Sequence, residues 1–239
     1  MRSAIFGLFL LLLVTPLAVA DEWARTYNIQ DSDFVYLGHP LITDGGIYLP
    51  GVYDVGFSSK FFYVMSFDPS TGDLVWVKKL TFKVNGTELK PQSLLKNSGL
   101  ILRKCLDGNI IGFFRVSRLD ATAFSGTVVF KITPGGEVLW ARYYRAWQYK
   151  KTYDKYLTRE LIPVDAAVTE DGIYVLAETI GWFSSSGDAS VLMKLSPDGK
   201  LECARVYGAY TPPMRPVGIE PLGNGQVLLL VAWKKLTLY

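Results

Sequence analysis

One unit of sequence recurs along the chain and limits the folds that it can adopt. It consists of an apolar stretch, a turn that contains Pro and Gly, and a second apolar stretch that leads into basic and aromatic residues. Three copies are SFDPSTGDLVW from Ser66, KITPGGEVLW from Lys131 and KLSPDGKLEC from Lys194. The tail occurs once more without the rest, as WARTY from Trp23. Such a repeat predicts one structural unit that is used several times.

A second marker lies between these copies. TDGGIYL, LDGNIIGF, EDGIYVL and GNGQVLLL place an Asp-Gly or Asn-Gly pair at residues 44, 107, 171 and 224. These pairs favour tight β-hairpin turns, because both residues tolerate a positive φ. The Trp position of the first marker falls at 23, 76, 140 and 203, so both series advance by 53 to 64 residues. Two independent markers with one spacing indicate a regular repeat.

Each period holds four candidate strands, rich in Val, Ile, Tyr, Phe and Trp. In the first period they are 34–43, 46–53, 61–67 and 73–80. Only Tyr149 to Leu161 competes as a short helix. The pattern predicts an all-β chain, a β-propeller of four-stranded antiparallel blades. Three blades are continuous, and a fourth is closed by strands from both ends, Glu22–Tyr27 and Val227–Tyr239.

The last blade is short of residues. After Asn224 only 15 residues remain, whereas earlier blades use about 20 to reach their third strand. Three alternatives stay open: closure by a very short hairpin at Lys234-Lys235, an incomplete C-terminus, or pairing with another chain.

The segment SFDPSTGDLVW resembles the tryptophan-docking motif of quinoprotein-type (PQQ-like) propellers, Ala-x-Asp-x-x-Thr-Gly-x-x-x-Trp. Asp68, Thr71, Gly72 and Trp76 match, and Ser66 stands in for Ala. The resemblance implies that the Trp locks each blade to the next, with Trp23, Trp76, Trp140 and Cys203 in that position. Quinoprotein dehydrogenases have eight blades and dedicated cofactor ligands. This sequence has neither, so we expect no cofactor.

The first 20 residues have the pattern of a secretory signal peptide. Arg2 precedes an uncharged apolar run, and Ala18-Val19-Ala20 gives a small-x-small end. We expect cleavage after Ala20 and a single mature domain, 21–239, secreted or at the cell envelope. The alternative is an uncleaved membrane anchor. Secretion would make Asn85-Gly86-Thr87 a glycan acceptor, unless it is an unmodified loop.

Two cysteines are present, Cys105 and Cys203. In blade order, Cys105 ends an innermost strand and Cys203 lies on the outermost strand of the next blade. Those edges lie beyond the Cα separation that a disulfide allows, about 7 Å. The sequence therefore predicts two free, buried thiols.

The expected loops divide between two faces. The Asp-Gly and Pro-Gly turns are short and share one face, whereas the loops between second and third strands and between blades, including 80–99 and 145–160, share the other. Function on a rigid scaffold usually resides in such loops. The candidate binding residues are the aromatics Trp147, Tyr149, Tyr153, Tyr156, Trp182 and Phe183 and the carboxylates Asp54, Asp120 and Asp188. The competing interpretations are packing of the aromatics on a blade and turn chemistry of the Asp residues.

These features favour a secreted binding module for a protein or carbohydrate ligand. The net charge of +3 and the secretion signal argue against nucleic acid. The single histidine, His39, is expected in the core or lining a channel; the sequence has no Gly-x-Ser-x-Gly, no zinc spacing and no phosphate-cradling loop. We therefore name no catalytic or metal-binding residue. The alternatives are a carbohydrate-active enzyme that uses Asp54, Asp120 or Asp188, and a structural part of a larger surface assembly.

Overall fold

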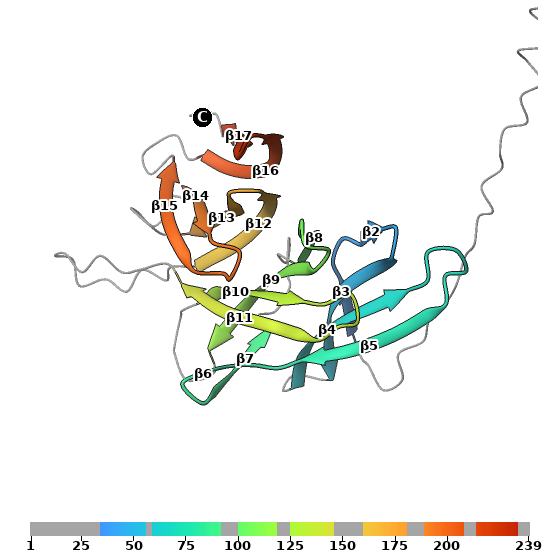
Figure 1. Ribbon diagram of the computed structural model, residues 1–239. Coiled ribbons are helices and arrows are strands. Elements are labelled where there is room, and N and C mark those ends of the chain that lie inside the picture. Colours follow the sequence, from blue (N-terminus) through green and yellow to red (C-terminus); the bar gives the residue numbers. More distant parts are fainter. Residues whose placement is uncertain are drawn as a thin grey trace, which may run out of the picture.

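The computed structural model describes residues 34–55, 59–91, 100–118, 125–145, 160–180, 189–207 and 214–233 (Figure 1). Within these ranges the regular structure consists entirely of β-strands, which confirms the all-β prediction. Apart from one parallel bridge, between Ser125 and Glu160, neighbouring strands are antiparallel. That bridge joins the second and the third of four successive groups of strands, which are named units 1 to 4 below.

Unit 1 is a four-stranded antiparallel sheet whose innermost strand is split in two. It comprises β1 (Phe34–Leu37), β2 (Leu41–Thr43), β3 (Gly46–Val55), β4 (Ser59–Phe67) and β5 (Leu74–Leu80). Both β1 and β2 pair with β3. The single strand predicted over 34–43 is thus interrupted at Gly38–Pro40, where Pro40 has no N–H for the ladder. His39 lies in this interruption and is exposed, so the structure excludes a core position, and a position that lines a channel stays a prediction.

Unit 2 follows the same plan, again with a divided innermost strand. It comprises β7 (Thr87–Pro91), β8 (Ile101–Lys104), β9 (Ile110–Arg118), β10 (Ser125–Ile132) and β11 (Val138–Arg145), and β7 and β8 both pair with β9. A short strand, β6 (Phe82–Val84), precedes it and forms a hairpin with β7.

The β6–β7 hairpin corrects the prediction of one long loop over 80–99. Its turn is Asn85-Gly86, with φ of 49° and 81°, the positive values that such a turn requires. The Asn-Gly pair carries the same hairpin signal as the Asp-Gly turns, in addition to its place in the predicted glycan acceptor. Asn85 is exposed, and its glycosylation stays a prediction.

Units 3 and 4 continue the series. Unit 3 contains β12 (Glu160–Thr169), β13 (Gly172–Ile180), β14 (Ala189–Leu195) and β15 (Leu201–Tyr207), and the described part of unit 4 is the hairpin of β16 (Met214–Gly223) and β17 (Gln226–Trp233). Of the short helix considered at 149–161, Glu160 and Leu161 belong to β12, and the rest lies outside the described residues. The predicted strands Glu22–Tyr27 and 234–239 also lie outside them.

The units pack face to face through shared hydrophobic cores. The core between units 1 and 2 contains Phe62, Phe82, Phe114 and Phe130, all buried. Phe114 is sandwiched there, with ring centroids 4.3 Å from Phe62 and 5.0 Å from Phe130 in stacked geometry. Because successive strand residues point to opposite faces, the same sheets present a second apolar face.

That second face of unit 2 packs on unit 3, and unit 3 packs on unit 4 in turn. The core between units 2 and 3 includes Phe113, Val129, Val175 and Leu195. The core between units 3 and 4 combines Ala167 and Leu176 with Ile219. Three consecutive interfaces thus join the four units in chain order.

The first strands of successive units are also neighbours: β2 contacts β8, β8 contacts β12, and β12 contacts β16. In Figure 1 β8 and β12 lie near the middle of the molecule, and β5, β11 and β15 lie farther out.

Candidate functional site

The turns between first and second strands and between third and fourth strands of units 1 to 3 lie at one edge of their sheets. The first pair of the β3–β4 ladder joins Ile47 to Phe67, which places the β2–β3 and β4–β5 turns side by side. The equivalent pairs in units 2 and 3 join Ile110 to Ile132 and Ile173 to Leu195. We call this the short-turn edge. In unit 2 it is tied by an ion pair, Lys131 Nζ to Asp107 Oδ2 at 2.6 Å.

The opposite edge is where the chain enters and leaves the segments outside the described residues. Val55 pairs with Ser59, Ser117 with Ser125, and Thr179 with Ala189 at the ends of their ladders. The connections between units begin and end there too, since Tyr207 pairs with Ser190 and Met214 with Trp233. We call this the long-segment edge. The longer segments that start and finish at it are 119–124, 146–159, 181–188 and 208–213, and the three residues 56–58 join β3 to β4 there. The Asn85-Gly86 turn lies at the same edge, since Leu89 pairs with Arg118 at the end of β9.

Most of the predicted binding residues belong to those segments. Outside the described residues lie Trp147, Tyr149, Tyr153, Tyr156, Trp182, Phe183, Asp120 and Asp188. Asp54 is the exception, because its backbone belongs to β3, opposite Lys60 at the long-segment edge. The described residues therefore bring together no pair of the three predicted carboxylates.

Two of the predicted docking tryptophans contact the unit that follows their own. The Trp76 indole Nε1 donates a hydrogen bond of 3.2 Å to the Pro134 carbonyl of unit 2. Its ring lies on Gly136, where an added Cβ would stand 3.1 Å from Trp76 Cη2. Gly136 has φ of 82°, so glycine supplies both the turn conformation and the room for the indole.

Trp140 makes the equivalent contact between units 2 and 3. A Cβ on Gly199, whose φ is 79°, would lie 2.6 Å from Trp140 Cζ3. The same turn is held by Arg142, whose Nε donates to the Asp198 carbonyl at 2.9 Å, and by the Tyr144 hydroxyl, which donates to the Gly199 carbonyl. Burial raises the pKa of Tyr144 to about 12, so its hydroxyl remains a donor across the neutral range.

Cys203 occupies the corresponding position in unit 3. The ladder register pairs Trp76 with Ser66, Trp140 with Lys131 and Cys203 with Lys194, each next to a bulge. Both cysteines are free, but only Cys105 is buried. Burial raises the pKa of the Cys105 thiol to about 11, whereas Cys203 is exposed, so the prediction of a buried thiol at Cys203 is wrong.

A polar network near the inner strands was missed by the sequence analysis. Asp165 of β12 accepts hydrogen bonds from Arg103 of β8, from the Ile219 backbone N–H of β16 at 3.1 Å and from the Ala166 N–H at 2.8 Å. Arg103 Nε donates in turn to the Ala166 carbonyl at 3.0 Å. One carboxylate therefore joins units 2, 3 and 4. The sequence does contain a signal for this network, because Asp165 is a charged residue within the otherwise apolar middle of the first strand of unit 3.

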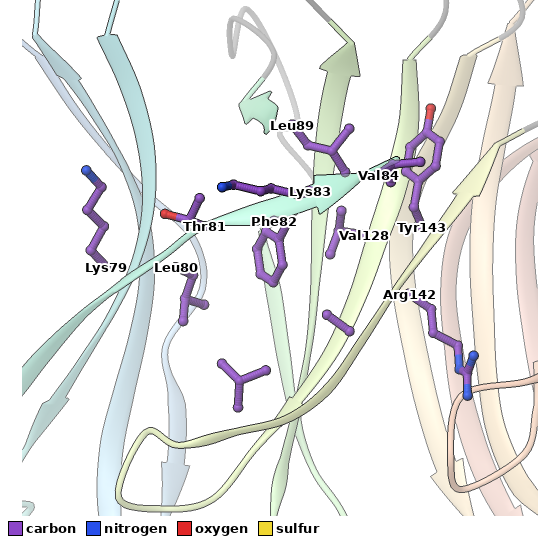
Figure 2. A pocket seen from close by; sticks show the side chains of 12 residues that line it. Lys79, Leu80, Thr81, Phe82, Lys83, Val84, Leu89, Val128, Arg142 and Tyr143 are labelled. Atoms are coloured by element: carbon purple, nitrogen blue, oxygen red, sulfur yellow. The ribbon is translucent and has the colours of Figure 1, made fainter. Parts of the chain in front are cut away.

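A groove of about 400 Å³ runs along the junction of units 1 and 2 (Figure 2). Its apolar wall includes Leu80, Phe82 and Val128, which are buried and belong to the shared core. Three cations, Lys79, Lys83 and Arg142, also line it.

Two of these cations are already engaged by the protein. Lys79 Nζ lies 3.3 Å from the centroid of the Phe61 ring, a cation–π contact, and Arg142 holds the turn of unit 3. In Figure 2 the Arg142 guanidinium points away from Lys79 and Lys83. The groove is therefore a gap between two packed units rather than a binding site with converging polar groups.

The described residues contain no cluster of three or more His, Cys, Asp or Glu side chains suited to a metal ion. None of them belongs to a helix long and apolar enough to cross a membrane. No protein-family model matches the sequence, and no curated protein is significantly similar to it.

Proposed function

We propose that the chain is a four-bladed β-propeller that acts as a secreted or cell-envelope binding module through its long-segment edge. The observation that carries this proposal is the division between the two edges. The short-turn edge is closed by tight turns, while the four longer connecting segments, 119–124, 146–159, 181–188 and 208–213, begin and end at the other. Binding residues are concentrated on loops that a rigid scaffold positions.

The propeller arrangement is supported by the way in which the units meet. Each consecutive pair shares a hydrophobic core, the first strands are neighbours in chain order, and Trp76 and Trp140 each dock on the next unit. Propeller blades contact one another in this manner around a central axis. The likeness of SFDPSTGDLVW to a PQQ-like docking motif agrees with the arrangement without adding a cofactor site.

The ligand class follows from the residues of segment 146–159. It carries Trp147, Tyr149, Tyr153 and Tyr156 among lysines and an arginine. Aromatic rings with a polar edge, interspersed with cations, suit stacking on sugar rings or contact with an acidic protein surface. We take carbohydrate as the first ligand to test, because secretion or envelope placement, proposed from the pattern of residues 1–20, exposes the module to surface glycans.

Replacing Trp147 and Tyr149 with alanine is expected to weaken carbohydrate binding by about tenfold or more, because anchoring aromatics carry much of the binding energy at such sites. The measurement is a glycan array, followed by titration calorimetry with the best ligand. The melting temperature should stay near that of the wild type.

A matched control is Tyr207→Ala at the end of β15, where the side chain is partly buried beside the same edge. That change should leave binding intact. A fall in melting temperature for the Trp147 and Tyr149 variants with unchanged binding would contradict the proposal and favour a packing role. Binding to protein ligands only, with no glycan retained, would reassign the ligand class.

A further inference from the structure

Three lysines gather at the long-segment edge where units 1 and 2 meet. Lys79 is the last residue but one of β5, and Lys83 and Lys90 belong to the hairpin of β6 and β7. Lys83 pairs with Glu88 across that hairpin, and Lys90 is two residues beyond Glu88, so these three side chains share one face of it. Figure 2 shows Lys83 extending toward the side of the groove on which Lys79 lies. We call Lys79, Lys83 and Lys90 the lysine cluster.

One carboxylate, that of Glu88, faces all three lysines. Lys90 Nζ donates to Glu88 Oε1 at 2.7 Å, and this hydrogen bond holds the pKa of Glu88 below its ordinary value. The positive charges of Lys90, Lys79 and Lys83 lower the same pKa further. Three ammonium groups therefore stand beside one carboxylate, which leaves the lysine cluster with an excess of positive charge. Lys79 and Lys83 are exposed to solvent.

The ring of Phe61 in β4 holds two of these ammonium groups. Lys79 Nζ lies 3.3 Å from the ring centroid and Lys90 Nζ lies 5.0 Å from it. A lysine ammonium has three N–H donors, so a cation–π contact leaves it able to bind an anion as well. Because an ammonium group covers this ring, the ring is not available for stacking on a nucleic-acid base.

The short-turn edge carries the opposite charge. Lys131 and Lys200 form ion pairs there with Asp107 and Asp198, but the carboxylates outnumber these lysines. The six turns between strands of units 1 to 3 at this edge contain eight carboxylates, namely Asp44, Asp68, Asp73, Asp107, Glu137, Glu170, Asp171 and Asp198. The field of the protein therefore attracts an anionic polymer to the lysine cluster and repels it from the short-turn edge.

We propose that the lysine cluster binds an acidic polysaccharide, a glycan that carries carboxylate or sulfate groups along its chain. The inference rests on the proposed binding module and specifies the chemistry of its ligand. Lysine is a compact point charge with rotatable donors, which suits single anionic groups presented at varied angles. The polysaccharide lies across the exposed side of the groove, where Lys79 and Lys83 are, and not against its apolar wall. Phe61 is a positioning residue, because it holds two of the ammonium groups.

The test is titration calorimetry of the whole protein with chondroitin sulfate and with alginate, and with dextran as the uncharged polymer. Both acidic polymers should bind at least about tenfold more tightly than dextran. Their binding should weaken about tenfold or more between about 50 and 200 mM salt, because each ion contact releases counterions from the polymer. Changing Lys79→Gln and Lys83→Gln together should weaken binding of both acidic polymers about tenfold.

The matched control is the double change Lys104→Gln and Lys200→Gln. It removes two exposed positive charges as well, but from the short-turn edge, so binding should stay within about twofold of the wild type. Equal losses in the two double variants would show that only the net charge of the protein matters, and the lysine cluster would then not be the site. Melting temperatures close to that of the wild type establish that both double variants are folded.

The positioning role of Phe61 has its own readout. Phe61→Leu should weaken binding of alginate about threefold while the salt dependence stays the same, because all three lysines remain. Phe61→Tyr keeps an aromatic ring and should bind as the wild type does. Equal losses for the leucine and tyrosine variants would contradict a role of the ring in holding the ammonium groups.

The remaining outcomes separate this inference from the proposed function. Single-stranded DNA or vesicles of acidic lipid that bind as tightly as the two acidic polymers would overturn the polysaccharide assignment. Failure of both acidic polymers to bind, with neutral glycans retained on the array, would overturn the lysine cluster and leave the binding module standing. If no glycan of any kind binds, the carbohydrate ligand class of the proposed function fails too. Loss of binding in the Trp147 and Tyr149 variants alone would likewise exclude the lysine cluster and support the module.

Discussion

Phe114→Ala is expected to lower the free energy of unfolding by about 3–5 kcal/mol, the usual loss for a fully buried aromatic ring. Phe114 has no exposed surface and lies between the rings of Phe62 and Phe130. The substitution would leave a cavity in the core that joins units 1 and 2, and it would also remove two stacked aromatic contacts. Urea unfolding followed by circular dichroism measures the loss.

Phe61→Ala, in β4 of unit 1, supplies the control. Its ring is partly exposed and contacts the Lys79 ammonium, so its removal should cost only about 1 kcal/mol. Equal losses for the two variants would mean that units 1 and 2 do not share this core. A Phe114→Leu variant should recover part of the stability, since it refills most of the cavity.

Asp165→Asn is the second change with a large expected effect, a loss of about 2–4 kcal/mol in the free energy of unfolding. The carboxylate is mostly buried, and it accepts from Arg103 and from the Ile219 N–H. An amide removes the charge that balances Arg103 and turns one acceptor into a donor that faces other donors. The expected loss of stability is smaller than for a fully buried ion pair, because the Arg103 side chain is partly exposed to water.

Glu202→Gln is the matched control for this charge. Glu202 pairs with Lys194 at 3.1 Å on the exposed strand β15, where water screens the interaction. The urea midpoint of the Glu202→Gln variant should stay close to that of the wild type. If Asp165→Asn behaved in the same way, the network would not join units 2, 3 and 4 in solution.

Local sequence signals predicted the elements that depend on local chemistry. The strands proposed at 46–53, 61–67 and 73–80 correspond to β3, β4 and β5, because Gly-containing turns and runs of β-forming residues mark their ends. The hairpin at Asn85-Gly86 carried the same signal and was missed when the pair was interpreted only as a glycan acceptor. The break in the first strand was also predictable, because Pro40 lacks the backbone N–H that a ladder hydrogen bond needs.

Other features depend on which units meet, and the sequence alone does not contain that information. Cys203 has the register of a docking residue, yet its exposure depends on what covers the outer strand of unit 3. The Asp165 network requires Arg103 and Ile219, which lie more than 50 residues away in either direction. The groove at Lys79 and Arg142 likewise exists only because β5 and β11 converge.

The central claim is that four units close into one ring within a single chain. The most direct test is light scattering after size exclusion of residues 21–239, with a thermal melt of the same sample. A monomer that unfolds in one cooperative transition is the predicted result, because a closed ring leaves no gap between units 4 and 1 where another chain could pair. A dimer, or a chain that aggregates and melts without cooperativity, would contradict the claim and show that the ring is completed by another chain or not at all.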